Sequence, residues 1–320
     1  TRDGIPVRCW VWPGNTADQN VVAEVKRDLN GWKLHRVVVV LDSGFNSEEN
    51  RRILQGAGDH YIIGEKLRVG PKGVPAEALR RGGKYRKLPD GLEIKEVVVG
   101  GDSAARRRFV IVRNPEEAER DRKKRESILA ELRQRLEALE QQPGEAHTKA
   151  ACELRAHETF GRYLRQTRGG RLVIDAAKVR REASLDGKFV ISSSDDFLPA
   201  EDLVYGYKQL WQVERVHRDL KHTVDVRPMY HRLEDRIRSH VLLCWLALLL
   251  IRVAENETGQ TWRQMHDLVG PLDVGRHVTA SSEVWQVRPL REEQKALFRA
   301  LHVELPPRYL KIVAPTRKTA

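Results

Sequence analysis

The first clear strand of the chain is RVVVVLD (residues 36–42), in which four valines and a leucine lead to the carboxylate of Asp42. An uninterrupted run of β-branched and aliphatic residues is typical of a strand that is covered on both faces. In open α/β sheets, functional groups gather at the carboxyl ends of the strands. The sequence therefore predicts an α/β core with Asp42 at a functional edge of its sheet.

Segments on both sides of this strand continue the α/β pattern. Before it, IPVRCWVW (residues 5–12) alternates as a strand does, and apolar residues at helical spacing predict a helix over residues 17–29. After it, Ser47 is placed to cap a short helix that ends near residue 55, and HYIIGE (residues 60–65) is typical of another strand. This order of elements favours an α/β fold.

The composition changes at Lys66, where glycines and prolines become frequent. LEIKEVVVG and RRFVIVRN predict a β pair, and residues 116–142 predict a densely charged helix with one apolar stripe. We favour a surface or hairpin helix over a dimerising coiled coil, which needs ~3–4 heptads. The α/β pattern returns at DGKFVISSS and leads to a long helix. The expected parts are 1–65 and 186–255 (the two parts of the core), 66–185 (an inserted α+β domain) and 256–320 (a helical C-terminal tail).

The charge balance suits a partner rich in phosphate. The 320 residues include 57 Lys and Arg against 45 Asp and Glu, which gives a net charge of +12. Such a balance suits a nucleic acid held mainly through its phosphates. Basic clusters at residues 106–108, 120–125 and 180–181 fit solvated surfaces as well as DNA contacts.

Membrane spans and cysteine-based sites are not expected. The longest apolar run, VLLCWLALLLI (residues 241–251), is shorter than the ~20 residues of a spanning helix and predicts a buried core helix. Cys9, Cys152 and Cys244 are scattered, without the spacing of a disulfide framework or a zinc site. They are typical of reduced intracellular thiols.

A stripe of reactive side chains is predicted on the long helix at about residues 200–223. Tyr207, Glu214 and Lys221 recur every seven residues and so share one face, with Trp211 and Arg218 beside them. Taken alone, such a stripe is also what a solvated helix face with a Glu214–Arg218 ion pair would show.

Two spaced motifs resemble those of a known family. VVVVLDSGFNSEEN is similar to the region around the second catalytic aspartate of the DDE transposases encoded by bacterial insertion sequences. YKQLWQVERVHRDLK resembles their Tyr-(2)-Arg-(3)-Glu-(6)-Lys signature, matched here by Tyr207, Glu214 and Lys221, with Leu210 in place of the arginine. VRPMYHR, DGIPV and PGNTAD are also similar to segments of that family.

The resemblance implies a ribonuclease-H-like fold, a mixed sheet flanked by helices, with an insertion between Asp42 and Glu214. It also implies that these two carboxylates are catalytic and hold two Mg²⁺ or Mn²⁺ ions. Such ions lie ~3.5–4 Å apart, prefer oxygen ligands, activate the nucleophile and relieve charge on the leaving oxygen. A structural reading of Asp42, as the cap of the next helix, stays open.

The DNA contacts implied by the resemblance come from the helix stripe. Arg218 and Lys221 would hold backbone phosphates, and Tyr207 would bind or pack on the strand. For Trp211, packing is favoured over base stacking.

The implied function is DNA transposition, with metal-dependent cleavage and strand transfer at insertion-sequence ends. The family's first catalytic aspartate is expected upstream of Thr1, because Asp3 and Gly4 form a turn motif, so this fragment is expected to bind DNA without cutting it. A non-catalytic DNA-binding remnant of a transposase, acting as an end-binder or inhibitor, is the alternative. A structural protein that associates through its charged helix is a third, less favoured hypothesis.

The implied partners are double-stranded DNA, at transposon ends and target sites, and a second copy of the chain as a homodimer on paired ends. No membrane and no small-molecule substrate are expected. The expected location is the bacterial cytoplasm, in association with the nucleoid.

Overall fold

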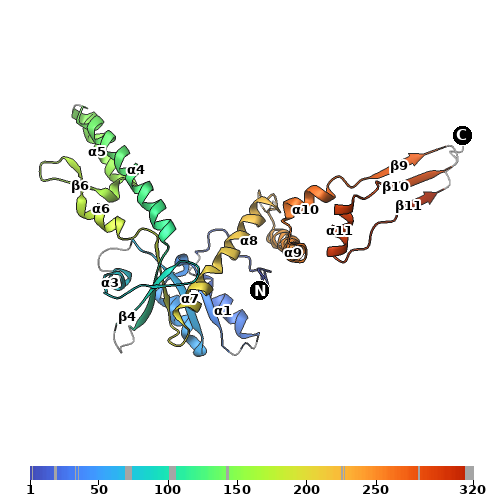
Figure 1. Ribbon diagram of the computed structural model, residues 1–320, viewed down its shortest axis with the longest axis horizontal. Helices are drawn as coiled ribbons and strands as arrows, with labels where there is room; N and C mark the ends of the chain where they lie inside the picture. Colours follow the sequence, from blue (N-terminus) through green and yellow to red (C-terminus); the bar gives the residue numbers. More distant parts are fainter. Residues whose placement is uncertain are drawn as a thin grey trace. The chain divides into compact units, whose positions relative to one another are not determined.

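The structure, a computed structural model, describes residues 1, 3–17, 20–32, 34, 36–68, 74–100, 106–141, 144–224, 226, 228–279 and 282–313. The chain forms two compact units (Figure 1). One unit is Gly14–Leu210, and the other combines Thr1–Pro13 with Trp211–Ala320.

A six-stranded mixed sheet forms the centre of the unit Gly14–Leu210. Its strands, in spatial order, are β1 (Val38–Leu41), β2 (His60–Glu65), β8 (Lys188–Ser193), β5 (Arg107–Arg113), β4 (Glu93–Val99) and β3 (Arg86–Lys87). β1 and β2 run parallel, with Leu41 beside Ile63, and the remaining neighbours are antiparallel. The expected α/β class with a mixed sheet is confirmed, and it is consistent with a ribonuclease-H-like transposase fold.

Helices cover both faces of this sheet, namely α1 (Val22–Asn30), α2 (Glu48–Gln55), α3 (Val74–Arg80) and α7 (Ala200–Lys208). α7 packs Leu203 in a core with Ile62 and Ile191. Because side chains alternate along a strand, the neighbouring Ile63 points to the opposite face, where it packs with α1 and α2. α3 covers Phe109 on that same face.

β1 is covered on both faces, as its unbroken apolar sequence predicted. Val38 and Val40 pack with the α7 core, whereas Val39 and Leu41 pack with α1 and α2. All four side chains remain only half-buried, because β1 is the edge strand of the sheet. The strand therefore ends at a sheet edge that solvent reaches.

The charged helix expected over residues 116–142 is present as α4. Around it lie α4 (Pro115–Glu140), α5 (Gly144–Ala156), η4 (Gly161–Tyr163), β6 (Leu164–Gln166), β7 (Leu172–Ile174) and α6 (Ala176–Ala183). α4 and α5 form a helical hairpin whose core includes Leu132, Leu139 and Leu154 (Figure 1). The hairpin interpretation of α4 agrees with this packing.

The sheet continues across the expected boundary between residues 65 and 66. β3, β4 and β5 come from the segment 66–185, yet they lie in the same sheet as β1 and β2. The helical part of that segment has a separate apolar cluster around Leu132. The division into four domains stays a prediction.

The second unit contains four helices and a small sheet among its described residues. They are α8 (Leu210–His222), α9 (Glu234–Thr258), α10 (Trp262–Val269), α11 (Glu292–Ala300), β9 (Val274–Val278), β10 (Glu283–Val287) and β11 (Tyr309–Val313). The three strands pair antiparallel in the order β11-β10-β9. The expectation of a helical tail over residues 256–320 is therefore wrong in part. VGRHV, EVWQV and YLKIV have the β-branched and aromatic character of strands.

Two other expectations differ from the structure. Residues 5–12 form no strand, because no described strand pairs with them and an alternating pattern alone makes no ladder. The helix expected over residues 200–223 is interrupted at Gln209, which separates α7 from α8. Gly206, a poor helix former, lies in the last turn of α7.

α9 is the one helix of the described residues that is long and apolar enough to cross a membrane. The expectation of no span rested on the longest uninterrupted apolar run, which underestimates a helix with a few polar residues. Length and composition alone do not identify a membrane segment. The expectation of a buried core helix over residues 241–251 is wrong, because Leu243 is 66% exposed, Leu250 is 67% exposed and only 22% of the apolar window of α9 is buried. Near its end, Arg252 and Glu255 form ion pairs with α8.

Replacing Leu203 by alanine should destabilise the unit Gly14–Leu210. Leu203 is fully buried in the α7 core, and a Leu→Ala change at such a site costs about 2–5 kcal/mol. Urea unfolding, followed by circular dichroism, measures the change. The control is Asp202→Asn on the exposed side of α7, which weakens only a first-turn interaction with the helix dipole and should cost less than about 1 kcal/mol. Equal stabilities of the two variants would contradict the packing of α7.

Candidate functional site

Asp42 lies immediately after β1, at the carboxyl end of the two parallel strands. Its Oδ1 accepts a hydrogen bond of 2.6 Å from the backbone N–H of Ser43 and so caps η2 (Ser43–Phe45). The structural reading of Asp42 as a cap is thus realised, although by a 3₁₀ turn, while Ser47 caps α2. Oδ2 has no hydrogen-bond partner among the described residues, and the side chain is exposed. One carboxylate oxygen is therefore available to a cation.

Tyr207 of α7 reaches this carboxylate from 165 positions away in the sequence. Its hydroxyl lies 3.4 Å from Oδ1 of Asp42 and is placed to donate to it. Its ring stacks on Phe189 of β8, with the ring centres 5.8 Å apart. The structure thus brings together the aspartate of one sequence motif and the tyrosine of the other.

Gly64 of β2 makes room for this contact. A Cβ atom at this position would lie 2.3 Å from the Tyr207 hydroxyl oxygen and 3.2 Å from the Ser43 nitrogen. Asn46, from the segment after Asp42, donates to the Gly64 carbonyl oxygen at 3.0 Å. Gly64 was not among the residues expected at the site. A glycine inside the strand HYIIGE is the signal that could have indicated it, because such glycines often mark a close approach.

Glu65, the next residue, is a second carboxylate near this edge that was not expected at the site. It follows Gly64 in β2 and therefore points to the opposite face of the sheet. Its Oε1 accepts a hydrogen bond of 2.6 Å from Ser192. Among the described residues, no group of three or more His, Cys, Asp or Glu side chains is placed to hold a metal ion.

The rest of the expected site lies on α8, in the other unit. Glu214, Arg218 and Lys221 are exposed, and none of their side chains has an ion pair or hydrogen bond with another described residue. The Glu214–Arg218 pair of the solvated-face interpretation is therefore not formed. Trp211 is 52% exposed, so it is not a core residue. Whether Glu214 and Asp42 share a metal pair stays a prediction.

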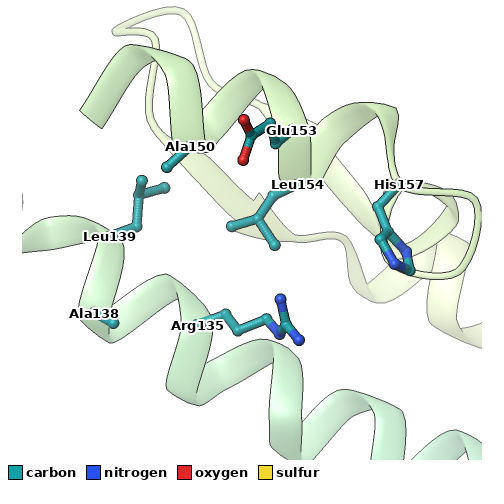
Figure 2. Close-up of a pocket in the computed structure, with 7 residues that line it drawn as sticks. All are labelled: Arg135, Ala138, Leu139, Ala150, Glu153, Leu154 and His157. Atoms are coloured by element: carbon teal, nitrogen blue, oxygen red, sulfur yellow. The ribbon is translucent and has the colours of Figure 1, made fainter. Parts of the chain in front are cut away.

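The helical hairpin holds a pocket of a different kind (Figure 2). Figure 2 shows its lining, which is Arg135, Ala138 and Leu139 from α4 with Ala150, Glu153, Leu154 and His157 from α5 and the residues after it. Arg135 stacks its guanidinium 4.9 Å from the centre of the Phe160 ring and pairs with Glu131. The pocket contains none of the expected site residues, so it does not coincide with the candidate site.

The comparison with protein families agrees with the family that both motifs resemble. Residues 1–250 match the family model of the transposase DDE domain, and the chain therefore belongs to this family. The matched range includes Asp42, Tyr207 and the stripe of α8. A search of curated proteins finds no match.

The contact between Gly64 and Tyr207 can be tested by stability. Gly64→Ala should destabilise the unit by about 1–3 kcal/mol, because the added methyl group overlaps the Tyr207 hydroxyl. The loss should be smaller in a Tyr207→Phe background, which removes the overlapping oxygen. Chemical denaturation of the four proteins in this cycle gives the coupling.

Gly56→Ala is the matched control, since a Cβ there meets no atom within 4 Å. It should leave the coupling to Tyr207 at zero. An equal cost of Gly64→Ala with and without the Tyr207 hydroxyl would show that the close approach is not present in solution.

Proposed function

We propose that this DDE transposase cleaves and rejoins DNA at insertion-sequence ends with two divalent metal ions, which Asp42 and Glu214 help to hold. The observation that carries the proposal is the Asp42 carboxylate, which lies beside Tyr207 of the family signature and has one oxygen without a donor among the described residues. Glu214 supports it, because this carboxylate is exposed and unpaired among the described residues. Two acidic side chains with available oxygens fit a hard cation such as Mg²⁺ or Mn²⁺.

The protein orients the Asp42 carboxylate before any ion binds. The Ser43 N–H and the Tyr207 hydroxyl both bond Oδ1 of Asp42, so its side chain is fixed while Oδ2 points away from these donors. A metal pair bound there supplies charge relief and lowers the pKa of a bound water or hydroxyl nucleophile. A further carboxylate, the family's first catalytic aspartate, completes the proposed ligand set.

The cations of α8 bind the DNA backbone in this proposal. Arg218 and Lys221 lie within two turns of Glu214 and are free of carboxylate partners among the described residues. Unpaired cations gain most from phosphate contacts, because binding releases counterions from DNA. Trp211 is exposed enough to contact a strand as well. Leu210 contributes no charge where the family has arginine.

The proposed partners are transposon-end and target DNA, and a second copy of the chain on paired ends, in the bacterial cytoplasm near the nucleoid. The alternative is a DNA-binding remnant that occupies ends without cutting them. Both hypotheses predict DNA binding, and only the first predicts DNA cleavage that is lost when a metal ligand is replaced. Cleavage and binding are therefore both measured, on the 320 residues and on the longest protein encoded by the same reading frame.

In the protein that cuts, Asp42→Asn and Glu214→Gln should each reduce Mg²⁺-dependent cleavage to background while DNA affinity changes little. Each substitution removes a charged metal ligand and keeps the shape of the side chain. Cleavage of labelled end DNA on denaturing gels and binding by fluorescence anisotropy give the two readouts. Full cleavage by the Glu214→Gln protein would show that Glu214 is not a catalytic metal ligand.

Lys221→Ala should weaken DNA binding and reduce its salt dependence. Loss of one phosphate contact lowers the slope of log K against log [salt] by about 0.9 for duplex DNA. Affinity is measured by anisotropy at several NaCl concentrations. Lys149→Ala on α5 removes the same charge from an exposed residue away from α8 and should leave the slope unchanged. Equal slopes for both variants would exclude Lys221 as a phosphate contact.

A further inference from the structure

Four charged side chains of α8 and α9 form a closed charge ring (Arg215, Asp219, Arg252, Glu255). Arg215 pairs with Glu255 at 2.9 Å and approaches Asp219 at 3.9 Å. Arg252 pairs with both Asp219 and Glu255. Each guanidinium therefore contacts both carboxylates, one from its own helix and one from the other helix.

The α9 side of the charge ring is buried. The Arg252 side chain is 5% exposed and that of Glu255 is 12% exposed. The second oxygen of Glu255 accepts a hydrogen bond of 3.0 Å from the backbone N–H of Trp262, at the start of α10. Removing one member of a buried ion pair is strongly destabilising, whereas an apolar contact of similar volume would often be as stable. Stability alone therefore does not account for charges at this position.

The charge ring faces away from the proposed catalytic stripe. At about 100° per residue, Arg215 lies about 100° and Asp219 about 140° around α8 from Glu214. On the ring side the ionic groups are paired, whereas Glu214 and its neighbours Arg218 and Lys221 have no partner among the described residues. Apolar contacts between two helices tolerate rotation, but ion pairs with fixed guanidinium geometry restrict it.

We propose that the charge ring positions Glu214 by fixing the rotation of α8 about its own axis against α9. Asp219 and Arg252 are positioning residues in this proposal, because their charged groups are paired with each other, that of Arg252 also with Glu255, and act through the orientation of α8. The proposal rests on the function proposed above for Glu214. The added point is that the charge ring keeps the Glu214 carboxylate and Lys221 on the exposed face of α8.

The rotation of α8 can be measured without any reaction. Spin labels are attached at His217→Cys on α8 and Glu257→Cys on α9, both exposed positions outside the charge ring, in a Cys9→Ser, Cys152→Ser background. Cys244 stays, because it is buried. Pulsed EPR should give a narrow distribution of the distance between the two spin labels when the charge ring is native. Asp219→Asn should broaden or shift it, and Asp219→Glu, which restores the charge, should return it toward the native distribution.

Cleavage by the longest protein encoded by the same reading frame provides the second readout. Asp219→Asn should lower the rate per folded molecule about 10- to 100-fold, as loss of groups that orient metal ligands does, and should raise the Mg²⁺ concentration for half-maximal rate. Asp219→Glu should recover most of the rate. If Asp219→Asn does not fold, Arg215→Met on the more exposed side of the ring replaces it.

The outcomes separate this proposal from the function of Glu214. An unchanged distance distribution in folded Asp219→Asn overturns the positioning role, whatever the cleavage data show. A changed distribution with unchanged cleavage per folded molecule overturns it as well. Failure of the function itself is recognised separately, by full cleavage in Glu214→Gln with the native ring.

Discussion

The packing of α7 against the mixed sheet is the interaction on which the Asp42 site depends. Leu203 holds the helix on the face that β2 and β8 share, and this placement carries Tyr207 to the end of β1. The approach is possible because Gly64 has no side chain where the Tyr207 hydroxyl lies. The buried contact of Leu203 and the lack of a side chain at Gly64 thus allow the Tyr207 hydroxyl to reach the Asp42 carboxylate, which is distant from it in the sequence.

Local patterns predicted much of this fold. The run of valines in β1, the β pair of β4 and β5, the charged helix α4 and the Ser47 cap of α2 each correspond to an element of the structure. Such signals are short in range, since they depend on side-chain periodicity and capping within one segment. The break at Gln209 was not predicted, because the heptad stripe from Tyr207 to Lys221 reads as one continuous helix.

Which strands pair with one another could not be predicted from the periodicity of the sequence. Residues 5–12 alternate but find no partner strand among the described residues, while β3, β4 and β5 join a sheet that composition had assigned to another part. At the site, the sequence named Asp42 and Tyr207 but not their contact, nor the role of Gly64. The charge ring was also missed, although an arginine at the end of an apolar helix, Arg252, is a signal that a buried partner is needed.

The number of basic residues in the chain overstates the surface available to DNA, because many of their side chains are in ion pairs with carboxylates. On α4, Arg122 pairs with Glu119 and Glu126, and Arg135 pairs with Glu131. Paired cations release fewer counterions on binding, so they add little to the salt dependence of affinity. The stripe of Arg218 and Lys221 differs, since its cations have no such partners among the described residues. These two cations are thus expected to contribute to phosphate affinity on the helix face that also presents Glu214.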